Sequence, residues 1–129
     1  MNFTRIKETC IYMHDLEQAH TFYHGLLELP IYHYEKGKHI FFKAGQSMLL
    51  CFNPEDSRLK TSPPGHYAAG PYHFAFEVKQ HEYALMKARV MSKGITIDQE
   101  VRWKNNLESF YFKDPADKIL EIVPEGIWD

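Results

Sequence analysis

The stretch PYHFAFEV, residues 71–78, opens the second half of the chain and shows how the whole chain is organised. Its residues alternate as in a β-strand, with bulky apolar side chains on one face. The other face carries His73, Ala75 and Glu77. An imidazole and a carboxylate on one strand face suggest that this face lines a site rather than a core.

The order of elements around this stretch occurs twice along the chain. In the first half, the sequence patterns predict a strand over 5–13, a helix over 14–28 and three short strands within 31–53. These three strands are broken by turns at EKGK (35–38) and AGQS (44–47). In the second half, the patterns predict a strand over 72–78, a helix over 80–94, and strands over 95–101, 108–114 and 117–123. Asp15 is the expected cap of the first helix. The expected inward side of the second helix is made mostly of Tyr83, Leu85, Met86, Ala88, Val90 and Met91.

Residue matches support this repeat and predict the fold class. Glu8 and His73 each lie seven positions before the foot of a helix, and LLCFNPE (49–55) matches ILEIVPE (119–125), which pairs Cys51 with Glu121. We therefore predict an α+β fold in which two β-α-β-β-β modules pair into an open, curved, mixed sheet with helices on the outer face. Residues 1–129 would form one domain, with half-modules 1–55 and 71–129 joined by a linker, 56–70.

Composition excludes several kinds of partner. Apolar residues make up 44% of the 129 residues, which is enough for a core. The basic residues are scattered and the net charge is −2, so nucleic acid is not an expected partner. No apolar run approaches the roughly 20 residues that cross a membrane. The absence of a secretory signal and of a C-x-x-C pair predicts a cytoplasmic protein without a disulfide scaffold.

Three side chains far apart in the sequence could form a metal site. Strand alternation puts Glu8, His73 and Glu121 on faces that would line the inside of a cup. A glutamate between Ile119 and Val123 is costly to bury unless another charge compensates it. Two carboxylates and a neutral imidazole nearly neutralise a divalent cation and suit Zn, Mn, Fe, Co or Ni without selecting one of them. Three protein ligands would leave positions open for water or substrate.

Each of these residues also has an ordinary structural explanation. Taken alone, His73 could be a hydrogen-bonded interior histidine, Glu8 a solvated charge at a strand edge and Cys51 a small buried apolar residue. The repeat favours the metal site, because it places the polar residues of these otherwise apolar strands at equivalent positions in the two halves.

Three segments resemble the vicinal oxygen chelate superfamily: YMHDLEQAHTFYHGLLELPI (12–31), YHFAFEV (72–78) and SFYFKDPADKILEI (109–122). This superfamily includes glyoxalase I, fosfomycin-resistance proteins, extradiol dioxygenases and bleomycin-resistance proteins. The resemblance implies the paired fold described above and a central metal held by Glu8, His73 and Glu121. It also implies a homodimer, in which Glu8 of one subunit could face the histidine and glutamate of the other.

Fosfomycin thiol transferases provide further candidates by resemblance. The predicted substrate-binding residues are Thr9, Cys51, Arg102, Lys104 and Tyr111, and no residue is assigned a catalytic role. Two departures stand out. Glu8 replaces the histidine that is the first ligand of those transferases, and Cys51 replaces a glutamate of glyoxalase I, so strict glyoxalase I activity is not expected.

These observations together predict a metal-dependent lyase, isomerase or transferase that binds neighbouring oxygens of a small substrate. Two alternatives remain open at this point. One is a fosfomycin-type thiol transferase, and the other is a metal-free protein of the bleomycin-resistance kind that binds an aromatic small molecule. The complete set of two glutamates and a histidine favours an enzyme.

Overall fold

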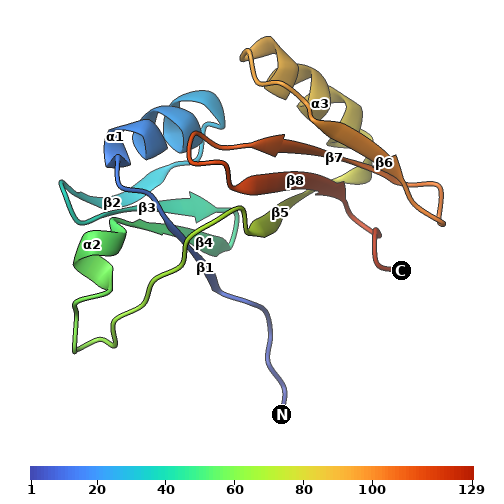
Figure 1. Cartoon of the computed structure of the whole chain (residues 1–129). Coiled ribbons are helices and arrows are strands. Elements are labelled where there is room, and N and C mark those ends of the chain that lie inside the picture. Colours follow the sequence, from blue (N-terminus) through green and yellow to red (C-terminus); the bar gives the residue numbers. More distant parts are fainter. The chain divides into compact units, whose positions relative to one another are not determined.

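Two copies of the β-α-β-β-β order account for all eight strands of the chain (Figure 1). The structure, a computed structural model, describes residues 1–129. The chain divides into two compact units, Met1–Ala69 and Gly70–Asp129, and each contains a four-stranded mixed sheet. The predicted α+β fold class is therefore confirmed. None of the helices is both long and apolar enough to cross a bilayer.

Unit 1 contains the first sheet, in the strand order β1-β4-β3-β2. Its strands are β1 (Glu8–Tyr12), β2 (Ile31–Glu35), β3 (His39–Ala44) and β4 (Ser47–Phe52). Strand β1 runs parallel to β4, and the other neighbours are antiparallel. The two hairpins turn at Gly37 and Gly45, where the backbone φ angles of 79° and 61° favour glycine. Both turns lie where the sequence predicts them.

The first helix begins where predicted but changes its geometry partway along. Helix α1 (Leu16–Ala19) continues directly into η1 (His20–Leu26), which is a π-helix. The Asp15 side chain caps the start by accepting a hydrogen bond from the backbone N–H of Glu17 at 3.1 Å. Near the end, the N–H of Leu27 bonds to the carbonyl of Phe22, five residues back. The predicted segment is therefore helical, although only its first part is α-helical.

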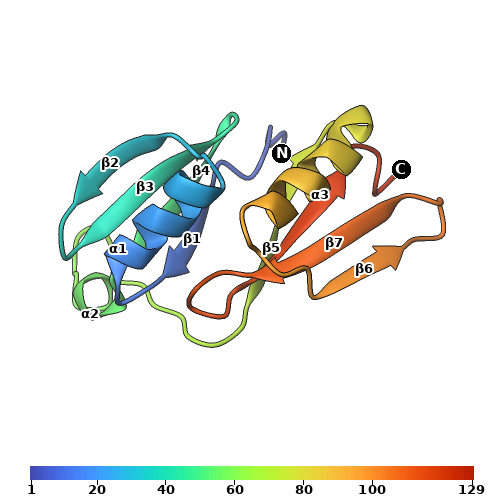
Figure 2. The same ribbon diagram turned by 90° about the horizontal axis from the view of Figure 1, so that it is seen from above.

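This helix covers one face of the first sheet, as Figure 2 shows. Tyr23 is fully buried, and its ring lies 5.5 Å from that of Phe42 on β3, centroid to centroid. The side chains of β3 and β4 alternate between this covered face and the opposite one. Unit 1 therefore has a core face toward the helix and a second face that carries other chemistry.

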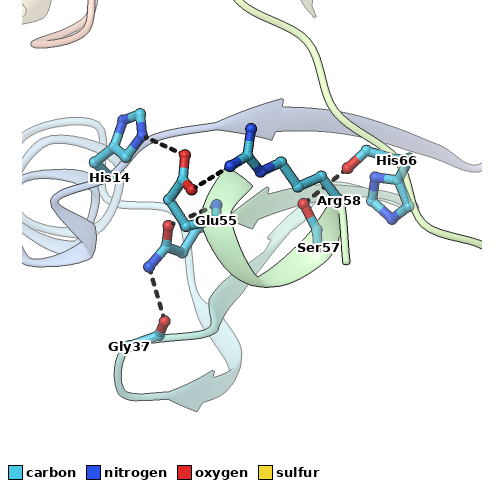
Figure 3. A network of polar contacts seen from close by, with 7 residues as sticks. His14, Gly37, Glu55, Ser57, Arg58 and His66 are labelled. Carbon is cyan, nitrogen blue, oxygen red and sulfur yellow. Dashed lines mark hydrogen bonds and ion pairs between the residues drawn. The ribbon is translucent and has the colours of Figure 1, made fainter. Parts of the chain in front are cut away.

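A short helix, α2 (Pro54–Ser57), holds the segment that follows β4 (Figure 3). The Asn53 side chain accepts from the backbone N–H of Glu55 at 3.1 Å and donates to the carbonyl of Gly37 at 3.0 Å. The buried hydroxyl of Ser57 donates to the carbonyl of His66 at 2.8 Å. These bonds tie the chain after α2 back onto unit 1.

Unit 2 repeats the arrangement, in the strand order β5-β8-β7-β6. Its elements are β5 (His73–Val78), η2 (Gln80–Glu82), α3 (Tyr83–Ser92), β6 (Gln99–Arg102), β7 (Glu108–Lys113) and β8 (Ile119–Pro124). Strand β5 runs parallel to β8, and β7 is antiparallel to both β6 and β8. The strand predicted over 95–101 is in fact shorter and begins at Gln99.

The predicted inward side of α3 is partly wrong. Leu85 and Met91 are 64% and 57% exposed, and Ala88 is exposed as well. The inward side follows the i, i+3, i+4, i+7 spacing of Tyr83, Met86, Lys87 and Val90. Lys87 belongs to it because its ammonium reaches Glu100 of β6 at 2.7 Å. Apolar residue type alone therefore misplaced the inward face of this helix.

Candidate metal centre

His73 and Glu121 meet on neighbouring parallel strands of unit 2. His73 opens β5 and lies in register with Ile119, two residues before Glu121 on β8. The imidazole Nε2 is 3.0 Å from the Glu121 Oε1. Glu121 is only 7% exposed, whereas the His73 side chain is 46% exposed. A buried carboxylate therefore faces a ring nitrogen of a partly exposed imidazole.

The hydrogen bond of the other ring nitrogen, Nδ1, determines which tautomer His73 adopts beside Glu121. Its Nδ1 lies 2.9 Å from the backbone carbonyl oxygen of Ile119, which can only accept a hydrogen bond. The proton of a neutral His73 therefore belongs on Nδ1, and Nε2 presents a lone pair to the oxygen of Glu121. Two acceptors at this distance need a cation between or beside them, either a proton on Nε2 or a metal ion.

The geometry of the pair fits a shared metal ion. Transition-metal bonds to imidazole nitrogen and carboxylate oxygen are about 2.0–2.2 Å long. Two such ligands at about 90° to each other would have donor atoms about 3.0 Å apart, and the His73 and Glu121 atoms are 3.0 Å apart. The bond from Nδ1 to a carbonyl is also the usual way in which proteins orient a metal-binding imidazole.

Tyr111 lies beside this pair. It is in register with Glu121 across the β7–β8 ladder, and its ring centroid is 5.8 Å from that of His73. Its neighbour Phe110 packs against Tyr83 of α3, so Tyr111 and Glu121 project from the face opposite α3. Burial raises the pKa of Tyr111, and the Glu121 carboxylate raises it further. The phenol therefore keeps its proton at neutral pH and can donate a hydrogen bond.

Glu8 belongs to unit 1, where it is exposed at the start of β1. It shares its strand face with Cys10, whose thiol pKa is raised by burial and then by the Glu8 carboxylate. Neither unit by itself has three His, Cys, Asp or Glu side chains placed to hold one metal ion. The pair in unit 2 therefore needs a further ligand to complete a metal site.

The predicted pairing of Cys51 with Glu121 is wrong by one residue. Glu8 is in register with Met48, as His73 is with Ile119, so Leu50 occupies the position of Glu121 in unit 1. Cys51 lies on the face covered by α1 and is fully buried. The match misled because β4 is apolar on both faces, so its sequence carries no alternation to fix the register.

Three other predicted substrate-binding residues do not share a strand face with the proposed ligands of their own unit. The comparison is with Glu8 in unit 1 and with Glu121 in unit 2. Thr9 projects from the face of β1 opposite Glu8, since neighbouring strand residues alternate. Arg102 is ion-paired with Glu108, on the face that carries Glu100 toward α3. Lys104 is exposed in the turn between β6 and β7. Of the three candidates in unit 2, only Tyr111 lies next to the His73–Glu121 pair.

Two further side chains of unit 2 contact each other and were not predicted from the sequence. Ser109 is fully buried two residues before Tyr111, and the indole Nε1–H of Trp103 donates to its hydroxyl at 3.0 Å. Strand alternation counted back from Tyr111 would have found Ser109. Nothing in the sequence pattern indicates Trp103, because the turn after β6 determines where its ring lies.

The fold agrees with the relationships of the chain. The family described as the Glyoxalase/Bleomycin resistance protein/Dioxygenase superfamily matches residues 5–122. The chain therefore belongs to this superfamily, as its motifs predicted.

Individual relatives are enzymes of two kinds. A lactoylglutathione lyase from Agrobacterium tumefaciens is 32% identical, with a TM-score of 0.91 and 98% of each chain covered. Glutathione transferase FosA of Serratia marcescens is 29% identical over 84% of this chain and 72% of its own length. The fosfomycin resistance protein FosX from Listeria monocytogenes, solved with Mn(II), is 16% identical, with a TM-score of 0.71 over 98% of this chain and 94% of its own. This last likeness concerns the fold alone.

Replacing Glu121 by leucine, the residue that unit 1 has at this position, separates a structural role from a functional one. We expect Glu121→Leu to leave the free energy of unfolding of the metal-free protein unchanged or to raise it by about 1 kcal/mol, because a buried carboxylate is removed. Urea denaturation with a chelator present measures this change.

Leu50→Glu is the matched control, since it introduces a carboxylate at the equivalent position of unit 1. It should lower the free energy of unfolding by about 3 kcal/mol. A comparable loss in Glu121→Leu would show that Glu121 holds the fold together and would contradict a functional role.

Proposed function

We propose that this protein is a metal-dependent enzyme of the glyoxalase superfamily, in which Glu8, His73 and Glu121 hold one divalent cation. The facing acceptor atoms of His73 and Glu121, 3.0 Å apart, are the observation that carries this proposal. The donor set suits Zn, Mn, Fe, Co or Ni. When bound, such a cation supplies a Lewis acid that holds two neighbouring oxygens of a small substrate.

The internal repeat supports Glu8 as the third ligand. Glu8 opens the first strand of unit 1 as His73 opens the first strand of unit 2, and each pairs with a residue of the parallel strand beside it. Equivalent positions in the two modules would thus provide ligands to one centre. Two carboxylates would also bring the charge of the cation close to zero, which offsets the cost of burying Glu121.

The residues around the proposed centre have distinct tasks. Ile119 orients the imidazole of His73 through its carbonyl, and the sheet fixes Glu121 beside it. Tyr111 keeps its proton because burial and Glu121 raise its pKa, so it can donate to a carboxylate or to a substrate oxygen. We expect this phenol to orient groups rather than to act as a base.

We further propose that the enzyme is a cytoplasmic homodimer and that residues 1–129 act as one domain. Glu8 of one subunit would then be able to join His73 and Glu121 of the other. Closed twofold symmetry would form two equivalent centres in such a dimer.

A thiol transferase acting on an epoxide phosphonate is the second candidate, favoured by the 29% identity to glutathione transferase FosA over 84% of this chain. Incubation with glutathione and fosfomycin separates it from lyase chemistry, for which the likeness to a lactoylglutathione lyase suggests lactoylglutathione as the first compound to test. Adduct formation would establish the transferase, and its absence together with turnover of lactoylglutathione would exclude it.

The metal content of the purified protein tests the leading proposal. Protein prepared without a histidine tag or chelator should contain about one divalent metal ion per chain by elemental analysis. His73→Ala and Glu8→Gln should each lose most of that metal, because each removes one of three protein ligands. His81→Ala, at an exposed histidine of η2, is the control and should retain it. Equal trace metal in all four proteins would instead favour a metal-free binding protein.

Mixing two defective variants tests whether the centre is shared between subunits. After subunit exchange between Glu8→Gln and His73→Ala, a centre built across the dimer would be intact once in each hybrid dimer. The mixture should then recover about a quarter of the wild-type metal content. No recovery after demonstrated exchange would contradict a shared centre and place all three ligands within one chain.

A further inference from the structure

The hairpin of β2 and β3 carries a second group of side chains of the metal-binding types. In the sequence HYEKGKH (33–39), His33 and Glu35 lie two residues apart on β2, and His39 is in register with Glu35 on β3. All three side chains therefore project from one face of the hairpin. Strand β2 is an edge of the sheet in unit 1 (Figure 2), and His33 on it is exposed.

The two histidines of this hairpin meet through their ring nitrogens. Nδ1 of His33 lies 2.8 Å from Nε2 of His39. Two neutral rings at this distance share one proton, so one of them directs a lone pair at the other. Two metal–nitrogen bonds of about 2.0–2.1 Å that meet at about 90° put their nitrogens about 2.9 Å apart, whereas a tetrahedral ion needs about 3.3 Å. The separation thus suits an ion that prefers right angles, such as Cu(II) or Ni(II).

The surroundings of His39 keep its ring fixed and uncharged. The residue is only 9% exposed, and its ring stacks on that of Phe41 with the centroids 4.1 Å apart. Burial lowers the pKa of His39, and the neighbouring His33 lowers it further, against the opposing effect of the Glu35 carboxylate. The ring is therefore neutral at pH 7, which is the form that binds metal ions. The exposed ring of His33 is free to turn toward a shared ion.

Two buried side-chain atoms have no hydrogen-bond partner, and both belong to this region of unit 1. They are Nδ1 of His39 and Oδ2 of Asp56. Asp56 lies on α2, which begins two residues after Phe52, the β4 residue in register with His39. The ammonium of Lys60 is 3.5 Å from this oxygen but donates no hydrogen bond to it. An ion on Nε2 would leave the ring proton of His39 on Nδ1, and a carboxylate is the usual acceptor for that proton in metal-bound histidines.

We propose that the β2–β3 hairpin is a second metal site, in which Nδ1 of His33 and Nε2 of His39 hold one Cu(II) or Ni(II) ion and Glu35 completes the protein ligands. The Glu35 carboxylate lies 3.4 Å from the Lys38 ammonium in an exposed ion pair, which contributes little and leaves it free to turn toward the ion. Only two ligand atoms are in place before the ion binds. The hairpin should therefore bind more weakly than a centre with three protein ligands and fill only when metal is added.

This site is separate from the centre proposed above. Tyr12 of β1 is in register with Phe52 of β4, which is in register with His39 of β3. Glu8 lies four residues before Tyr12, so it is about 13 Å from the level of His39 along the strands. The inference therefore does not rest on the proposed function. His73→Ala removes the proposed centre and leaves the hairpin unchanged, so it is the background for the test.

Titration calorimetry with Ni(II) measures the site in that background, which should bind about one ion per chain. Adding His33→Ala should weaken binding by more than about 100-fold, since losing a ligand costs more than losing its hydrogen-bond partner. His39→Phe should do the same while keeping a ring stacked on Phe41. Glu35→Gln should weaken binding by about tenfold, because an exposed carboxylate contributes less than an imidazole already in place.

The matched control is His20→Ala, at the other close pair of histidines in unit 1. The rings of His20 and His24 are 5.3 Å apart, centroid to centroid, on η1. This variant should bind Ni(II) as the background does. A loss of binding in His20→Ala but not in His33→Ala would put the ion on the helix and overturn the inference.

Electron paramagnetic resonance of bound Cu(II) gives a readout that a merely structural role would not move. Splitting by ligand nitrogens should show two imidazoles in the His73→Ala background and one after His33→Ala is added. A Cu(II) spectrum that His33→Ala leaves unchanged, or no Ni(II) binding by the background protein, would overturn the inference and leave the proposed function standing.

Discussion

The imidazole of His73 has an acceptor on each side, and this constraint organises the candidate site. A backbone carbonyl accepts a hydrogen bond from Nδ1–H, and a carboxylate oxygen lies 3.0 Å from Nε2. The arrangement needs one more positive charge to be satisfied. Because Glu121 is buried, no solvent shell can supply this compensation cheaply. The two side chains and one main-chain oxygen of unit 2 thus leave a requirement for positive charge that the proposed cation would meet.

The mixed sheet of unit 2 separates the core from this chemistry. Phe110, Phe112 and Leu120 are fully buried on the side of α3, and their neighbours in sequence project from the opposite face. Substitutions that change the chemistry of that opposite face can therefore leave the core packing intact. The two modules show how this freedom is used, since Leu50 in unit 1 and Glu121 in unit 2 occupy the same position. One module keeps an apolar residue where the other carries a proposed ligand.

The sequence predicted the architecture well, because alternation and turn residues act locally. Gly37, Gly45 and Asp15 mark turns and a helix start that the structure confirms. The sequence failed where local pattern carries no information. Strand β4 is apolar on both faces, so the register of Cys51 was misjudged by one residue. Lys87 lies on the inward side of α3 because of Glu100, a partner from another element that no helical pattern reveals.

The candidate site was predicted only in part, for the same reason. Alternation correctly put His73 and Glu121 on one face, and the structure brings their side chains into contact. Thr9 and Arg102 were chosen by resemblance to other proteins rather than by strand face. Thr9 projects from the face opposite Glu8, and Arg102 from the face opposite Glu121. Trp103 reaches Ser109 through the geometry of a turn, which depends on tertiary structure. Whether Glu8 joins the pair remains a prediction.

Anomalous diffraction from crystals of the metal-loaded protein tests the central claim most directly. The account predicts one strong peak per chain at the absorption edge of the metal, about 2.0–2.2 Å from Nε2 of His73 and from an oxygen of Glu121, with a carboxylate of Glu8 in the same coordination shell. A peak bound elsewhere, or loaded crystals in which a proton alone bridges His73 and Glu121, would contradict it.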